Sequence, residues 1–160
     1  MSTKTTPTKI LIQANSESGS RPIHDLDPAA VTVIRPGQLL EMNASEQIIV
    51  HASANGPARP TRVSVENPYG DDPTSSALDN DYAIGENVRY IYPQAGDLLF
   101  MLIEASAVLV KGITMLASAG DGSLQVIVPD ATTVEGTIVA RAEEDVTIGG
   151  SAARALVRMV

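Results

Sequence analysis

The stretch from Ala95 to Val128, AGDLLFMLIEASAVLVKGITMLASAGDGSLQVIV, holds the densest apolar run of the chain and decides its fold. Leu98–Ile103 is a run of six apolar residues, and Ala105–Val110 is nearly as apolar. Both runs are much shorter than the ~18–20 residues of a transmembrane helix. They are rich in aliphatic residues and bounded by glycine turns, which indicates buried strands. A helix over Leu98–Val110 stays open as an alternative, because Met, Leu, Glu and Ala favour helices.

The segment Ser118–Ser123, with the sequence SAGDGS, predicts a hairpin turn inside this stretch. Glycine supplies the positive φ that tight hairpin turns need, and an Asp side chain can bond its own backbone. Residues 113–116 and 124–128 are therefore expected to pair as a β-hairpin. Gly112, just before the first strand, marks an expected sharp change of direction.

The composition limits the classes of function. The chain has 160 residues, a hydrophobic fraction of 44% and only 3% aromatic residues, which suits one domain with an aliphatic core. Its net charge of −8 repels phosphate, so nucleic-acid binding is not expected. It has no cysteine, which excludes disulfides and thiol chemistry. The first residues lack the apolar core of a signal peptide, so we expect synthesis in a cytoplasm and no membrane partner.

Short alternating segments separated by proline and glycine turns occur along the whole chain. They predict an all-β fold, a small β-barrel or β-sandwich. Residues 22–160 are expected to form a single β domain, and residues 1–21 a flexible N-terminal arm and linker. Outside the central stretch, the expected strands are residues 31–34, 39–42, 47–52, 61–66, 87–92, 136–142 and 153–160.

The N-terminal arm is polar at first and then carries a β-prone apolar triplet. We expect this arm to dock on a partner, because the polar linker 14–21 separates the triplet from the rest of the chain. The alternative is that the triplet is the first strand of its own domain. The candidate contact residues of the arm are Lys4, Lys9, Ile10, Leu11 and Ile12.

Residues 67–83 form a long polar excursion, expected to project as a loop and to contact a partner. Its aspartates could gather around Ca²⁺, but they do not match the EF-hand spacing, so no metal site is expected. The alternative is a solvated acidic loop. Its candidate contact residues are Tyr69, Asp71, Asp72, Asp79, Asp81 and Tyr82.

Catalytic patterns are weak throughout the chain. His24 and His51 share no ligand spacing, and each is expected at the surface or in a loop. No G-x-S-x-G elbow occurs, and the short Gly149–Ser151 turn precedes a strand rather than the helix of a phosphate loop. We therefore expect a protein that is not an enzyme and that uses no cofactor.

A series of turn motifs fills the second half of the chain. Their order resembles that of the capsid decoration, or cement, proteins of tailed bacteriophages. The segments that carry the resemblance are YAIGENV (82–88), PQAGD (93–97), VKG (110–112), LASAGDGSL (116–124), ARAEE (140–144) and RALVR (154–158).

This resemblance implies a structural protein of the virion. Such a protein binds the outer surface of the phage head, contacts the major capsid protein and forms homo-oligomers, with a trimer favoured and a dimer possible. It would be synthesised in the cytoplasm of a bacterial host. The part before Tyr82 departs from the short form of the family, which leaves the oligomer and the binding site open.

Two other functions compete with this expectation. The alternative is a phage adhesin or fibre-base protein that binds host-surface glycans. The absence of Trp and the small number of other aromatic residues argue against it, because glycan sites usually offer aromatic platforms. A small β-fold hydrolase is the other, and the missing triad argues against that.

Overall fold

The computed structural model describes residues 9–14, 21–25, 27–29, 31–58, 61–69, 76–130, 133 and 136–160. These residues form twelve β-strands and no helix, so the predicted all-β fold is confirmed. The helical alternative over Leu98–Val110 is wrong, because this segment forms β6 (Leu98–Ile103) and β7 (Val108–Leu109). No helix in the described part of the chain is long and apolar enough to cross a membrane.

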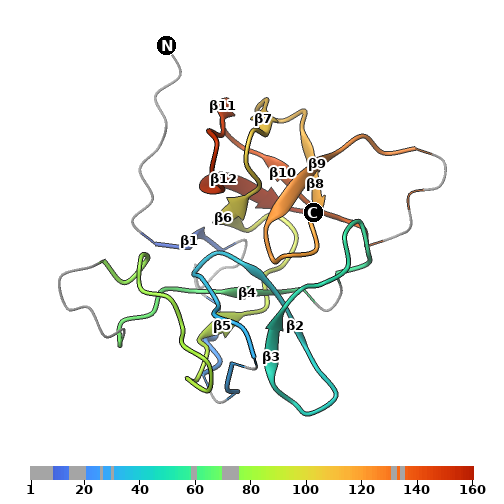
Figure 1. Ribbon diagram of the computed structural model, residues 1–160. Coiled ribbons are helices and arrows are strands. Elements are labelled where there is room, and N and C mark those ends of the chain that lie inside the picture. The colour runs from blue at the N-terminus through green and yellow to red at the C-terminus, as the bar shows by residue number, and fades with distance from the viewer. Residues whose placement is uncertain are drawn as a thin grey trace.

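Five strands close into a barrel (Figure 1). Four neighbouring pairs are antiparallel, and a single parallel pairing of Ile103 with Leu124 closes the ring. Residues that alternate along each strand point inward, and on β12 these are Ala155, Val157 and Met159. In order around the barrel, the strands are β6, β12 (Ala153–Met159), β10 (Ile138–Ala142), β8 (Met115–Ser118) and β9 (Leu124–Ile127).

The second edge of β6 is shared by three segments. Near its start β6 pairs with β1 (Leu11–Gln13), and near its end with β9. Between them the amide of Leu102 donates to the carbonyl of Gly37 at 2.9 Å. Gly37 has φ +89°, and a Cβ there would lie 2.9 Å from the carbonyl oxygen of Phe100. Only glycine allows this close approach.

A four-stranded sheet packs below the barrel (Figure 1). Leu39, Val63 and Ile91 on its upper face join the same hydrophobic core as the barrel. Its other face forms a second, smaller core. Isolated bridges join this face to one covering segment and that segment to a second, and they are formed on the two segments by His24, Pro28, Ala29, Ile34, Tyr82 and Asn87. The strand order is β3 (Ile48–Val50), β2 (Leu39–Met42), β4 (Arg62–Ser64) and β5 (Tyr90–Ile91).

A two-stranded ribbon of β7 and β11 (Val146–Thr147) stands at the far end of the barrel (Figure 1). The sequence did not predict β11 as a strand. It follows the acidic turn after β10 and lies opposite the chain that leaves β6. The ribbon therefore continues the barrel wall beyond the point where the ring closes.

The predicted central hairpin is confirmed, with Met115 opposite Ile127 and Ser118 opposite Leu124. Gly120 and Gly122 both have positive φ, as the turn requires. The expected strand 39–42 is present in full, and the other expected strands are present in shortened form, apart from residues 31–34. There the prediction is wrong, because only Ile34 forms a bridge, to Tyr82. Val31 and Val33 are exposed, so nothing pairs with this segment along its length.

Candidate partner-binding surface

The apolar triplet of the N-terminal arm belongs to the domain's own sheet, so its prediction as a docking segment is wrong. Ile10 is fully buried in the barrel core, and its carbonyl accepts a hydrogen bond from the amide of Phe100 at 2.8 Å. Leu11 and Ile12 are partly buried against the same core. The open strand edge that a partner was expected to offer is the edge of β6 in the same domain. Lys9 is exposed beside this strand, and Lys4 lies outside the described residues.

The end of the predicted linker is tied to the barrel by an ion pair. The Arg21 guanidinium donates to both carboxylate oxygens of Asp97, at 2.8 Å each. Asp97 is fully buried at the start of β6, and it also accepts from the amide of Gln94. The hydrogen bond to Asp97 raises the pKa of Arg21. This fork fixes the position of Arg21 against the start of β6.

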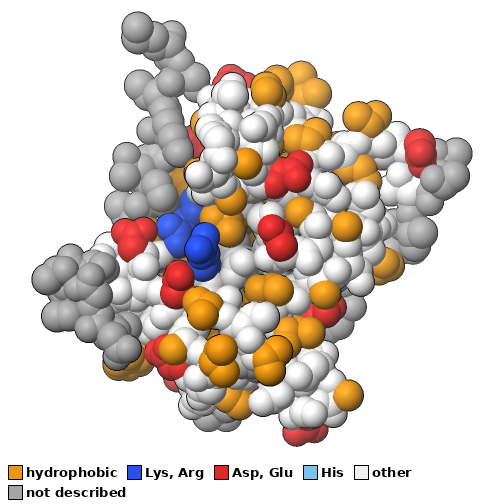
Figure 2. Space-filling model, viewed as in Figure 1, with side chains coloured by type: hydrophobic (Ala, Val, Ile, Leu, Met, Phe, Trp, Pro, Cys, Tyr) orange, Lys and Arg blue, Asp and Glu red, His pale blue; other side chains and the backbone are white. Residues whose placement is uncertain are grey.

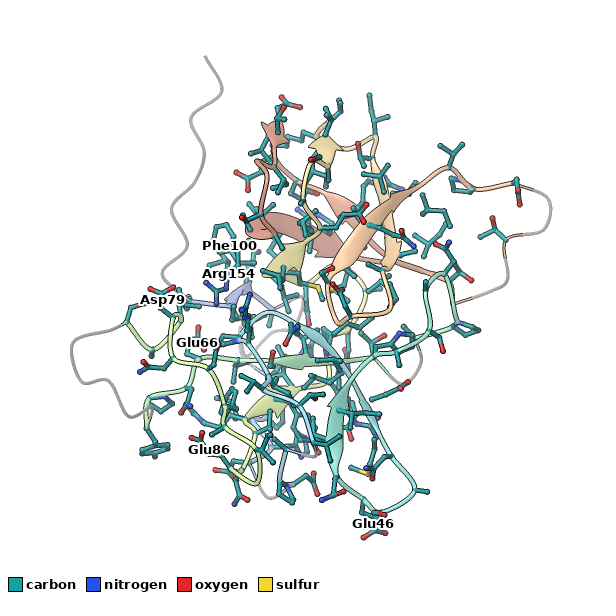
Figure 3. The ribbon with its side chains drawn as sticks, viewed as in Figure 1. Glu46, Glu66, Asp79, Glu86, Phe100 and Arg154 are labelled. Carbon is teal, nitrogen blue, oxygen red and sulfur yellow. The ribbon has the colours of Figure 1, made fainter. Side chains whose placement is uncertain are left out.

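A second arginine joins the acidic loop to the barrel. Arg154 on β12 donates from Nε to the carbonyl of Pro36 at 2.9 Å and from Nη2 to the carbonyl of Leu78. Its Nη1 lies 3.4 Å from a carboxylate oxygen of Asp79. Figure 3 shows Arg154 and Asp79 side by side between the barrel and the lower sheet. The part of the loop from residue 76 onward is therefore held by two contacts to one side chain, and the third contact of that side chain is to Pro36.

A shallow hollow of about 380 Å³ lies beside this clamp. Arg35 and Asp81 form a second, exposed ion pair on its wall, at 3.6 Å. Figure 2 shows the basic side chains of this face gathered in one place with acidic side chains around them. Each arginine of the hollow already has a carboxylate near it. The hollow is thus polar but charge-compensated, which suits a weak polar contact rather than a strong ion site.

The predicted contact residues of the loop are divided by the structure. Tyr69 is 80% exposed, and Asp79 and Asp81 are also exposed, so these three side chains are accessible to a partner. The prediction of Tyr82 as a contact residue is wrong, because this side chain is fully buried. Its hydroxyl donates to the carbonyls of Val65 and Glu66.

Burial raises the pKa of Tyr82, which keeps its hydroxyl protonated. The loop does not project along its whole length, because Asn67 at its start is also buried. Asp71 and Asp72 lie outside the described residues. Within the described residues, no group of three or more His, Asp or Glu side chains converges to hold a metal ion.

Sequence reasoning missed a buried polar contact between the two sheets. His51 lies in the loop that follows β3, which is one of its two predicted places, but it is buried and not at the surface; His24 is exposed, as expected. His51 Nδ1 lies 2.8 Å from Ser118 Oγ, and Nε2 lies 3.8 Å from a carboxylate oxygen of Glu41.

Serine, histidine and glutamate also form catalytic triads, but Ser118 is fully buried on β8 and its Oγ accepts from the amide of Gly120. The group therefore connects the barrel to the second sheet and does not present a nucleophile to solvent. The two partners are 67 positions apart, and no local pattern in the sequence signals their contact.

Aromatic side chains gather on the outer face of the second sheet. His24 stacks on Tyr90 with a centroid distance of 5.3 Å, and Tyr92 meets His24 edge-on at 5.0 Å. Arg62 lies over the Tyr92 ring at 5.2 Å. Burial, together with the hydrogen bond to Asp27, raises the pKa of Tyr90. Two of the four tyrosines and His24 therefore form one cluster.

Comparison with known proteins adds no assignment. Neither the scan against protein-family models nor the search of curated proteins returns a match.

Proposed function

We propose that this protein is a capsid decoration protein, which binds the outer surface of a tailed-phage head and stabilises contacts between major capsid proteins. In this role it has no catalytic activity and needs no cofactor. It assembles as a homo-oligomer, with a trimer favoured over a dimer.

The observation that carries the proposal is the ordered series of turn motifs in the second half of the chain. In the structure the four motifs that contain glycine lie at turns of the barrel and of the loop that covers the second sheet, whereas ARAEE begins on β10 and RALVR lies on β12. All five glycines in them have positive φ: Gly85, Gly96, Gly112, Gly120 and Gly122. The series is therefore a set of backbone requirements at successive turns, which gives its order more weight than chance similarity of loops would have.

Two further features support a structural role. Two buried polar contacts fasten the domain, because Arg21–Asp97 ties the chain to the start of β6 and His51–Ser118 connects the barrel to the second sheet, which suits a rigid module. Eleven large apolar side chains of the described residues are exposed, and they include Val31, Val128 and Tyr69. Burying such exposed apolar side chains against a neighbouring protein is favourable, so they offer contact points within a shell.

A cryo-EM map of the parent virion tests the proposal directly. We expect density that fits the barrel on the outside of the head, between capsomers. A second test mixes the purified protein with expanded heads that lack it and measures the occupancy by sedimentation. A map with the protein at the tail tip or absent from the virion would contradict the proposal.

The cluster of His24, Tyr90 and Tyr92 favours one alternative, a phage adhesin or fibre-base protein that binds host-surface glycans. Aromatic faces are the usual platforms for sugar rings. Here Tyr90 is buried and Arg62 covers one side of Tyr92, which leaves His24 as the most accessible ring. Binding to a glycan array that is lost in Tyr92→Ala would favour this alternative over the capsid role.

A further inference from the structure

Arg141 on β10 differs from the other arginines of the described residues. Each of those six has a polar partner, whereas the guanidinium of Arg141 has none within the described chain. Its Nε is buried and makes no hydrogen bond. A buried donor without a partner loses its hydration and gains nothing in exchange, which costs stability. Arg141 is thus a position where folding alone does not account for the residue.

The neighbours of Arg141 strengthen this observation. Arg141 lies directly opposite Arg158 on β12 and opposite Met115 on β8. Like charges in opposite positions of an antiparallel pair destabilise the sheet. The carboxylate of Glu143 in the same row is engaged with Arg158, whose Nε lies 2.6 Å from it. The row therefore carries two positive charges and one negative charge, and the excess positive charge belongs to Arg141.

Apolar side chains surround this row on the outer wall of the barrel. Leu156 lies opposite Glu143 and is partly exposed, and Val160 lies opposite Val139 and is 39% exposed. Ile113 is 72% exposed beside the backbone of β10. Arginine and methionine are enriched in protein interfaces, and arginine is frequent among the residues that contribute most to binding. We call Met115, Arg141, Arg158, Leu156, Ile113 and Val160 the arginine face.

We propose that the arginine face, centred on the unpartnered Arg141 guanidinium and the neighbouring Arg158, docks a carboxylate-bearing segment of another protein. A guanidinium fork matches the two oxygens of a carboxylate, and the match is strongest where apolar side chains exclude water. Under the proposed function, on which this inference rests, the segment belongs to the major capsid protein.

The charge of the chain separates this occupant from the others. A net charge of −8 repels a polyanion such as nucleic acid, and one free arginine does not offset it. A second copy of the chain brings the same net charge and the same positive row, so the arginine face is not complementary to itself. An acidic segment of a different protein avoids both problems, because it is neither a polyanion nor a copy of the positive row. It supplies the one group that the row lacks.

The test compares full-length variants for binding to expanded heads that lack the protein. Arg141→Gln should weaken binding about tenfold or more, and Arg141→Lys should restore only part of it, because lysine lacks the fork. The matched control is Arg35→Gln, which removes the same charge from the hollow near Asp81. Thermal unfolding of Arg141→Gln should occur at or above the wild-type temperature, since the variant loses no partner and removes a charge that faces Arg158.

Unchanged head binding in Arg141→Gln would overturn the proposal, and so would an equal loss in Arg35→Gln. An Arg141→Gln variant that changes oligomeric state in sedimentation would show that the occupant is a second copy, which also overturns it. If the wild-type protein does not bind heads at all, the proposed function fails, and a separate titration decides the site.

In that titration, NMR follows the Nε–H resonance of Arg141 while hexaglutamate is added to the wild-type protein. We expect a saturable shift that hexaglutamine does not cause. No shift would overturn the site. An equal shift from acetate at the same carboxylate concentration would indicate binding of any small anion and would overturn it as well.

Discussion

The burial of Ile10 makes the attachment of the N-terminal strand measurable. Ile10→Ala removes part of a fully buried side chain from the barrel core but keeps the backbone bond to Phe100. Truncations of this kind cost about 2–5 kcal/mol, through lost transfer free energy and the cavity left behind. For a chain of 160 residues this corresponds to a fall in melting temperature of roughly 4–20 °C. Deletion of residues 1–13 should destabilise the domain further.

The assay is thermal unfolding followed by far-UV circular dichroism, with urea unfolding to give the free energy. Ile84→Ala is the matched control, because Ile84 is 63% exposed and its truncation should change stability by no more than about 0.5 kcal/mol. Equal melting temperatures for Ile10→Ala, Ile84→Ala and the wild type would refute the reasoning. That result would mean that β1 leaves β6 in solution and is free to dock elsewhere.

The remaining predictions concern the turns, the buried ion pair, the clamp and the tyrosines. Gly120→Val should cost about 1–3 kcal/mol in urea unfolding, because Gly120 has φ +89° and a Cβ there would lie 3.0 Å from the amide of Ala54; unchanged unfolding would contradict this. Asp97→Asn should cost about 3 kcal/mol, since it leaves the Arg21 guanidinium without its carboxylate; a midpoint within error of the wild type would show that the pair is not formed. Arg154→Met should speed proteolytic cleavage between residues 67 and 83, whereas Arg158→Met should not; equal cleavage rates would exclude the clamp. Stability should fall as the pH rises above about 10, because unfolded tyrosines ionise there. Folded Tyr82 and Tyr90 have raised pKa values and keep their protons, so a flat pH profile would contradict their burial.

The central stretch was predictable because its signals are local. The hairpin of β8 and β9 follows from a six-residue turn with two glycines, and the apolar run of β6 from consecutive residues. Turn chemistry and side-chain alternation act over a few residues, so they can be read directly from the sequence. The alternation cannot say which strands become neighbours. The closure of the barrel by Ile103 and Leu124 is therefore visible only in the structure.

The N-terminal triplet shows why the other predictions failed. Its composition suits a strand in either place, and the polar linker after it suggested separation from the domain. Its position is decided by the edge of β6 that β12 does not occupy. This edge is open near the start of β6 and closed by β9 at its end. That edge exists only after five distant segments have paired. His51 and Ser118 illustrate the same limit, because each is ordinary in its own sequence neighbourhood.

The roles of charged side chains are the hardest to predict from the sequence, because they depend on partners that are distant in the chain. The sequence gives eleven basic residues in an acidic chain, and composition alone treats them as equivalent. In the structure the guanidinium groups of Arg21 and Arg154 are engaged within the fold. Arg21 is paired with Asp97 at the start of β6, and Arg154 holds a loop against the barrel. Arg141 contributes to neither, and its neighbour on β12 repels it. A residue that costs stability where it stands is better explained by a contact outside the chain than by one within it. Surface arginines can therefore be ranked as binding residues only after the partners of all the others have been assigned.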